Sequence, residues 1–175
     1  SYFINKFKLK IKKFFKERLM KEKMQIQMQA LLFCPSKLLQ NNFFSPEIIK
    51  LSEIYSKLPV IKKKINGSGS KSQLLIIKKW QVPIKIEKNF FIQKFFKNDE
   101  YGIDILNDLS GKYVHHCCRK KIVIRSGDTD KAKIVKSKTF KNFAIKLSSF
   151  LKHTGIIDVD FILKDKRIFI LDINC

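Results

Sequence analysis

The chain is poor in acidic residues for its length of 175 residues. It has 15 Asp and Glu against 37 Lys and Arg, which gives a formal net charge of +22. Basic proteins attract nucleic acid, anionic membranes or phosphorylated ligands. Lysine is spread along nearly the whole sequence among Ile, Phe and Asn, however, and this is as typical of a general compositional bias as of a binding surface. Charge alone therefore selects none of these ligand classes.

Cysteine is also scarce, and long apolar runs are absent from the sequence. The spacing of the 4 cysteines fits neither a disulfide framework nor a zinc signature, so we expect a reducing, cytoplasmic setting. No apolar run reaches the length needed to span a bilayer. The basic, apolar and small-residue pattern of a signal peptide is missing. Because the sequence begins at Ser1 and stops abruptly at Cys175, we expect it to be a fragment.

Two common phosphate-binding motifs are missing as well. The Gly/Ser-rich segment 66–72 lies between two short predicted strands, and its backbone N–H groups are suited to fold over phosphates. The G-x-x-x-x-G-K-[ST] pattern fails because its second glycine is not at the required place. The G-x-G-x-x-G pattern needs glycine where Ser72 stands. By itself, the segment is equally consistent with an ordinary hairpin tip.

Apolar residues are plentiful, and their spacing predicts an α+β fold. The 16 Phe and many Ile and Leu are sufficient for a core and argue against disorder. Helical spacing predicts a basic amphipathic helix near the N-terminus, a helix over 46–58 capped by Ser45, and a helix over 139–152. Residues 126–131 are predicted to form a polar loop. Strands are predicted at 58–64, 74–78, 89–96, 100–106, 112–116 and 118–125, with a hairpin at the end of the chain.

The terminal hairpin carries the clearest candidate site. Pairing Lys164 with Ile168 places six apolar side chains on one face: Val159, Phe161, Leu163, Phe169, Leu171 and Ile173. The other face then carries Asp158, Asp160, Asp172 and Asn174, with Asp160 directly opposite Asp172. Opposed like charges destabilise a sheet unless a cation lies between them, and oxygen ligands suit Mg²⁺ held together with nucleotide phosphates. The alternative interpretation is a solvated acidic face.

The sequence His115-His116-Cys117-Cys118 has the residue types of a metal cluster. Successive side chains of a strand point to opposite faces of the sheet, so these four cannot converge on one ion. We therefore do not interpret this segment as a zinc site.

Taken in order, the segments from 41 to 174 resemble the ATP-grasp superfamily, most closely the ligases related to the carbamoyl phosphate synthetase large subunit. Residues 58–63, LPVIKK, resemble the family's F-P-[apolar]₃-K strand, and residues 67–71, GSGSK, match its phosphate flap. Residues 92–96, IQKFF, resemble the segment that joins the two lobes. The terminal hairpin resembles the strand pair that holds Mg²⁺, and residues 125–131 resemble a basic loop near the substrate.

The resemblance implies a role for each matching residue. Lys63 would reach the nucleotide phosphates, and Glu100 would bind the ribose. The flap over the β- and γ-phosphates would consist of Gly67, Ser68, Gly69, Ser70 and Lys71. The adenine edge would be bound by the backbone of the linking segment, with Gln93, Lys94 and Phe96 as its residues. The Mg²⁺ ligands would be Asp160, Asp172 and Asn174, and the residues facing the carboxylate or acyl phosphate would be Arg125 and Lys131.

We therefore expect an ATP-grasp fold with a small lobe over 41–95 and a larger lobe over 96–175, preceded by a basic helical segment over 1–40. The implied function is binding of ATP and Mg²⁺ in a carboxylate–amine ligase that acts through an acyl phosphate. The implied partners are ATP and a small carboxylate, with no dedicated nucleic-acid site and no membrane span. The alternatives are a basic nucleic-acid-binding module and an inactive folded remnant of a ligase.

Several positions depart from the family pattern. Lys64 and Ile65 stand where the family usually has P-R, Lys94 replaces an acid, and Asn98 replaces a glycine. The family continues N-P-R-x-G-G after the metal-binding asparagine, whereas this sequence ends at Cys175. We therefore expect a truncated, divergent copy that is inactive on its own, and a partner chain is one source from which the missing ligase parts could come.

Overall fold

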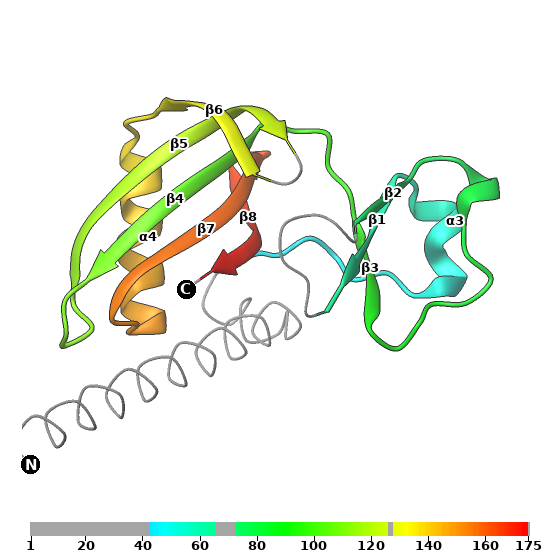
Figure 1. Cartoon of the computed structure of the whole chain (residues 1–175), viewed down its shortest axis with the longest axis horizontal. Helices are drawn as coiled ribbons and strands as arrows, with labels where there is room; N and C mark the ends of the chain where they lie inside the picture. Colours follow the sequence, from blue (N-terminus) through cyan, green and yellow to red (C-terminus); the bar gives the residue numbers. More distant parts are fainter. Residues whose placement is uncertain (1–42, 66–72, 126–127, 175) are drawn as a thin grey trace, which may run out of the picture.

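The computed structural model describes residues 43–65, 73–125 and 128–174. The predicted N-terminal helix and the predicted phosphate flap over 67–71 lie outside the described residues. The described residues form two antiparallel sheets, one of three strands and one of five (Figure 1). The prediction of an α+β fold is confirmed. Among the described helices, none is long and apolar enough to cross a membrane.

The small sheet has the strand order β2-β1-β3. Its strands are β1 (Val60–Lys64), β2 (Leu74–Ile76) and β3 (Phe90–Lys94). A 3-10 turn (Leu51–Glu53) leads into the short helix α3 (Ile54–Lys57), and a second 3-10 turn spans Lys79–Gln81. Its core consists of Ile49, Ile54, Val60, Ile76 and Ile92. The hairpin of β1 and β2 was predicted from the sequence and is confirmed.

The helix predicted over 46–58 is wrong in its first part. Residues 46–50 are not helical, because their backbone groups pair with β3 instead. Ile49 N donates to Ile92 O at 2.8 Å, and Lys94 N donates to Glu47 O at 2.8 Å. Helical structure begins only at Leu51, so Ser45 is not an N-cap.

The large sheet has the strand order β6-β5-β4-β7-β8. Its strands are β4 (Glu100–Asn107), β5 (Tyr113–Arg125), β6 (Asp128–Ile134), β7 (Gly155–Lys164) and β8 (Arg167–Asn174). Helix α4 (Lys138–Leu151) connects β6 to β7 and covers one face of the sheet (Figure 1). Ser137 caps α4 by accepting a hydrogen bond from Phe140 N at 3.5 Å. The opposite face of the sheet is therefore left free of helices in the described part of the chain.

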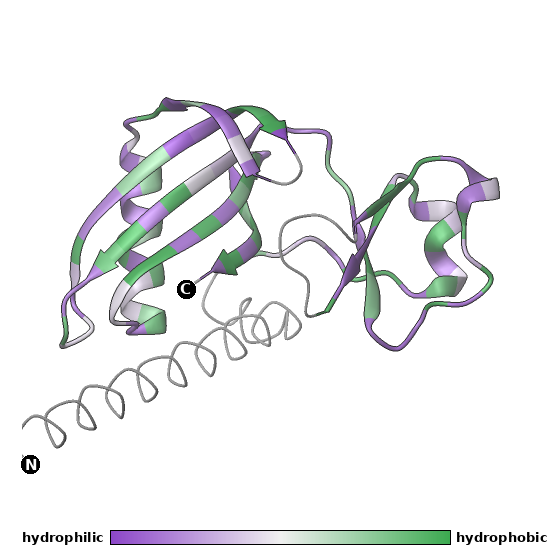
Figure 2. Cartoon of the chain, viewed as in Figure 1, coloured by the Kyte–Doolittle hydropathy of each residue, from purple (hydrophilic) through white to green (hydrophobic). Residues whose placement is uncertain are grey.

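The alternation of side chains separates the two faces of the large sheet. Residues such as Ile103, Ile105, Val159 and Phe161 are fully buried against α4. Between them along the same strands lie charged residues, so green and purple alternate along β4 and β7 in Figure 2. Phe43, which the sequence assigned to the small lobe, is buried in this core.

Two further predictions require correction. Residues 128–131, predicted as loop, belong to β6, where Asp128 pairs with Arg125 of β5. The side chains of β6 are largely exposed at the edge of the sheet, so backbone pairing forms this strand without an apolar alternation.

The register of the terminal hairpin also differs from the prediction near its turn. Lys164 pairs with Arg167 across a two-residue turn, in which Asp165 and Lys166 have φ values of 50° and 62°. A bulge between the Asp160 and Phe161 pairs then restores the predicted pairing of Asp160 with Asp172. As a result, the inward residues of β8 are Ile168, Ile170 and Ile173, rather than Phe169 and Leu171.

Candidate functional site

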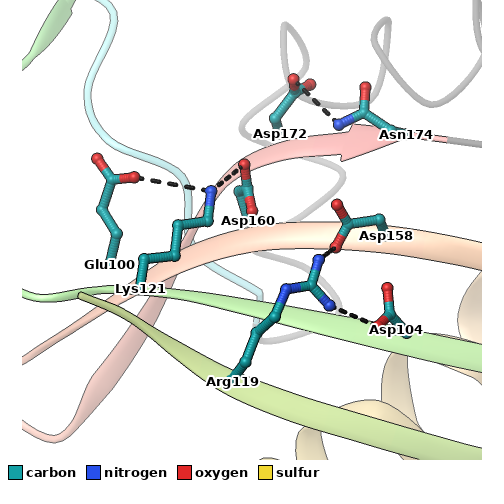
Figure 3. A network of polar contacts seen from close by, with 8 residues as sticks. All are labelled: Glu100, Asp104, Arg119, Lys121, Asp158, Asp160, Asp172 and Asn174. Carbon is teal, nitrogen blue, oxygen red and sulfur yellow. Dashed lines mark hydrogen bonds and ion pairs between the residues drawn. The ribbon is translucent and has the colours of Figure 1, made fainter. Parts of the chain in front are cut away.

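The face of the large sheet opposite α4 carries a network of charged side chains (Figure 3). The network draws on β4, β5, β7 and β8, whose alternation sends one charged set away from the apolar core. Its members are Glu100, Asp104, Arg119, Lys121, Asp158, Asp160, Asp172 and Asn174. Two cations of β5 each connect a carboxylate of β4 with a carboxylate of β7.

The first connection, which we call the arginine bridge, consists of Arg119, Asp104 and Asp158. Arg119 Nη1 donates to Asp104, and Nη2 donates to Asp158 Oδ1 at 2.9 Å. The guanidinium crosses β4 above Gly102, where a Cβ would lie 3.1 Å from Arg119 Cζ. Burial and the charge of Asp160 raise the pKa of the Asp158 carboxyl, while Arg119 opposes this shift. Both carboxylates of this bridge have a direct partner.

The second connection, the lysine bridge, consists of Lys121, Asp160 and Glu100. Lys121 Nζ lies 2.7 Å from Asp160 Oδ2 but 3.8 Å from Glu100 Oε2. The Lys121 side chain is only 5% exposed. Asp160 Oδ1 is buried and has no hydrogen-bond partner among the described residues. A buried carboxylate oxygen without a partner is costly, so this oxygen is a candidate position for binding a ligand.

Asp172 lies beside the lysine bridge, directly opposite Asp160 on the neighbouring strand. Its Oδ1 accepts a hydrogen bond from Ile173 N at 3.0 Å, and its Oδ2 accepts one from Asn174 Nδ2 at 3.4 Å. Burial raises the pKa of the Asp172 carboxyl, and the charge of Asp160 acts in the same direction. Lys63 acts against this shift.

Lys63 approaches this cluster from β1 of the small sheet. Burial lowers the pKa of its ammonium group, while the charges of Asp172, Glu100 and Asp160 raise it. No carboxylate of the described residues lies within 4.0 Å of its Nζ, so Lys63 faces the acidic cluster without a close ion pair. This lysine is the cation that the small sheet brings to the charged face of the large sheet.

The donor set fits Mg²⁺. Two opposed carboxylates and the amide of Asn174 are oxygen donors, and the unpartnered Asp160 Oδ1 is a place where a cation would remove an electrostatic penalty. Within the described ranges, no group of three or more His, Cys, Asp or Glu is placed so that it could hold a metal ion by itself. A metal held here would therefore need further oxygen ligands, such as phosphates or water.

The predicted adenine-binding residues lie where the two sheets are joined. Gln93 is buried and its Nε2 donates to Pro46 O at 3.1 Å. Lys94 Nζ donates to Lys57 O at 2.5 Å. The Phe96 ring packs 5.2 Å from the Phe169 ring. The side chains of Gln93 and Lys94 are thus already used inside the protein.

Arg125 and Lys131 lie apart from the charged network, on the β5–β6 hairpin at the edge of the sheet. Arg125 is 78% exposed and pairs with Asp130 at 3.2 Å. The structure therefore brings together Lys63, Glu100, Asp160, Asp172 and Asn174, but it does not join Arg125 and Lys131 to them.

Sequence reasoning did not select Arg119 or Lys121. Arg119 and Lys121 are two residues apart and so share a face of β5, but Lys120 between them is also charged, so the sequence carried no alternation of charge that could have found them. In the same strand Cys118 is buried, which raises its pKa to about 11, whereas Cys117 is exposed.

Comparison with known proteins gives the same fold. The model of the ATP-grasp domain family matches residues 21–175. No curated protein has a sequence that matches this chain. Among solved structures, the biotin carboxylase of Campylobacter jejuni, in complex with β,γ-ATP, has a TM-score of 0.64 and 15% identity, covering 84% of this chain and 40% of its own.

Two other solved structures are similar. The biotin carboxylase domain of the Hydrogenobacter thermophilus 2-oxoglutarate carboxylase, with MgADP and bicarbonate, has a TM-score of 0.63 and 10% identity, covering 82% of this chain and 38% of its own. The D-alanine–D-alanine ligase of Bacillus anthracis has a TM-score of 0.54 and 15% identity, covering 86% and 56%. The chain thus spans between 38% and 56% of the lengths of these three proteins.

Proposed function

This chain belongs to the ATP-grasp family, and we propose that it binds ATP and Mg²⁺ between its two sheets as part of a carboxylate–amine ligase. The observation that carries this proposal is the position of Lys63. It brings a half-buried positive charge from the small sheet towards the Asp160, Asp172 and Glu100 carboxylates of the large sheet. Phosphate and Mg²⁺ together match this pairing of a lysine with acidic oxygen ligands.

Each residue of the cluster has a defined task in this proposal. Lys63, which has no carboxylate within ion-pair distance in the part of the chain that the structure describes, binds a phosphate of the nucleotide. Glu100, which Lys121 approaches only to 3.8 Å, accepts hydrogen bonds from the ribose hydroxyls. Asp160 Oδ1, Asp172 and Asn174 hold Mg²⁺. When bound, Mg²⁺ neutralises phosphate charge and orients the γ-phosphate for transfer.

The proposed reaction has two steps. An oxygen of the substrate carboxylate forms a bond to the γ-phosphorus, and the bond to ADP breaks, which gives an acyl phosphate. The amine nitrogen then forms a bond to the acyl carbon and phosphate leaves, with one proton lost from nitrogen. Arg125 and Lys131, on the β5–β6 hairpin, are assigned to the substrate carboxylate in this proposal. The charged residues of this chain act through position and electrostatics.

Lys63→Ala tests the proposal, with Lys64→Ala as the matched control. Lys64 is the next residue of β1, but its side chain is exposed, whereas Lys63 is half-buried and faces the acidic cluster. Ligand at about 100 times its Kd stabilises a protein by about 2.7 kcal/mol. We expect Mg-ATP to raise the melting temperature of the wild type and of Lys64→Ala by several degrees, and that of Lys63→Ala much less.

Proteolysis of the same three proteins is a second measurement. Mg-ATP should protect residues 66–72 from cleavage in the wild type and in Lys64→Ala, and less in Lys63→Ala. Equal melting and equal cleavage with and without nucleotide in the wild type would contradict the proposed function.

A further inference from the structure

Lys121 contacts Asp160, one of the proposed Mg²⁺ ligands, yet the sequence resemblance gives it no role. We propose that Lys121 is a specificity-determining residue that makes this site select Mg²⁺ over Ca²⁺. It does so by leaving Asp160 a single oxygen for coordination. The inference rests on the proposed function, because it concerns the metal of the same site.

The first step of the argument is that Asp160 Oδ2 is occupied. Lys121 reaches it from β5 with Nζ at 2.7 Å, and the lysine side chain is 5% exposed (Figure 3). Leaving this position would separate a buried ammonium from a carboxylate that is only 23% exposed, which is unfavourable. Oδ2 therefore stays with Lys121 when a metal binds.

The second step concerns the other oxygen. Asp160 Oδ1 is buried and lacks a hydrogen-bond partner among the described residues. It is the oxygen that a cation can use without displacing Lys121. Bidentate coordination of Asp160, by contrast, would place the metal beside Oδ2 and so close to the Lys121 ammonium, where like charges repel.

The third step is the difference between the two ions. Mg²⁺ requires near-octahedral geometry at about 2.0–2.1 Å and commonly uses one or two carboxylates together with water and phosphate. Ca²⁺ takes 6–8 oxygen ligands at about 2.3–2.6 Å and often uses carboxylates in bidentate fashion. A carboxylate limited to one oxygen therefore costs Ca²⁺ a ligand but suits Mg²⁺.

The test uses Mn²⁺ alone as a reporter, detected by its effect on the relaxation of water protons. Bound Mn²⁺ is displaced by Mg²⁺ or by Ca²⁺, and the ratio of the two half-displacing concentrations measures selectivity. For the wild type we expect at least a tenfold preference for Mg²⁺. Lys121→Met keeps an apolar stem but cannot hold Oδ2, so we expect the preference to fall about tenfold.

Two control variants separate the hydrogen bond from the charge. Lys121→Gln removes the charge but keeps a donor near Oδ2, so both ions should bind more tightly with the preference retained. Lys120→Met removes the same charge one residue away, where the side chain pairs with Asp99 at 2.6 Å, and should leave the preference unchanged. Far-ultraviolet circular dichroism confirms that each variant is folded.

The outcomes are distinguishable. A wild type that binds Mn²⁺ but does not prefer Mg²⁺ overturns the inference without any variant, and so does an unchanged preference in folded Lys121→Met. In both cases the proposed function stands. If the wild type binds no Mn²⁺ at millimolar concentrations, the metal part of the proposed function fails, and the inference fails with it.

Discussion

The arginine bridge and the lysine bridge have the same arrangement of charges but differ in how many of their carboxylate oxygens have a direct partner. Each places a cation of β5 between a carboxylate of β4 and a carboxylate of β7. Arg119 bonds directly to both of its carboxylates, and its rigid fork suits such pairing. Lys121 bonds to Asp160 and lies 3.8 Å from Glu100, and Asp160 Oδ1 has no hydrogen-bond partner within residues 43–65, 73–125 and 128–174.

This difference suggests different roles for the two bridges, one in holding the strands together and one in binding a ligand. A network whose polar groups all have partners fixes neighbouring strands in place, whereas one with an unpartnered buried oxygen stores an unfavourable energy that a ligand can relieve. Lys63 lies on the side of the lysine bridge, where it interacts with Asp160, Asp172 and Glu100. We infer that the arginine bridge fixes β4, β5 and β7, and that the lysine bridge and its neighbours bind ligands.

The largest effect expected from this comparison is the loss of the arginine bridge. Arg119→Met leaves Asp104 and Asp158 without their shared cation. Breaking a buried ion pair costs about 3–5 kcal/mol, but Asp104 and Asp158 are 40% and 36% exposed, so we expect a loss of about 2 kcal/mol. Urea denaturation at neutral pH measures the loss. The increase in the free energy of unfolding that Mg-ATP gives, measured relative to the unliganded variant, should be as large as in the wild type.

The opposite pattern would exchange the roles of the two bridges. If Arg119→Met keeps its stability but loses stabilisation by Mg-ATP, then the arginine bridge is part of the binding site and the comparison is wrong.

A smaller effect is expected from Gly102→Ala. The new Cβ would lie 3.1 Å from Arg119 Cζ and Nε, and two carboxylates hold that guanidinium in place. The arginine must shift by a few tenths of an ångström, so we expect a loss of about 1 kcal/mol, although alanine also restricts the unfolded chain. Urea denaturation measures it. Combined with Arg119→Met, the alanine should cost nothing further, because its clash is gone.

Those parts of the fold that bury one face were predictable from the sequence. The strand pattern of 100–106 and the helix over 139–152 follow from regular apolar spacing. The pairing of Asp160 with Asp172 was predicted correctly, although the predicted turn was wrong, because the bulge offsets the two-residue turn. The edge strand β6 has no apolar face, and therefore no periodicity from which to predict it.

The two bridges could not be predicted for a different reason. Arg119 and Lys121 reach across β4 to β7, so their partners depend on the registers of two strand pairs at once. Local sequence spacing does not determine those registers. The helix prediction for residues 46–50 was wrong because Ile48 and Ile49 fit helical spacing, whereas pairing with β3 determines their actual conformation.

The smallest effect distinguishes a metal site from a solvated acidic face beside the lysine bridge. Asp172→Asn removes one of two opposed charges at nearly constant volume. In metal-free buffer at neutral pH we expect a gain of about 0.5–1 kcal/mol in the free energy of unfolding. The matched change Asp104→Asn, in the arginine bridge, should instead reduce stability, because Arg119 loses the negative charge of one of its two direct partners.

The pH dependence of this gain has a defined sign. Burial and Asp160 raise the pKa of Asp172 above 3.8, its ordinary value, so the folded protein binds this proton more tightly than the unfolded chain. The charged carboxylate therefore destabilises the fold above the folded pKa, and the penalty disappears as pH falls below the unfolded pKa. The stability advantage of Asp172→Asn over the wild type should shrink as pH is lowered from neutral towards about pH 4, as measured by urea denaturation at each pH.

Mg-ATP should stabilise the same variant less than it stabilises the wild type, because a metal ligand is lost. A solvated acidic face predicts neither effect, since separate exposed carboxylates interact weakly through water. Equal stability of the two proteins at neutral pH, together with equal gains from Mg-ATP, would therefore exclude a metal at Asp172.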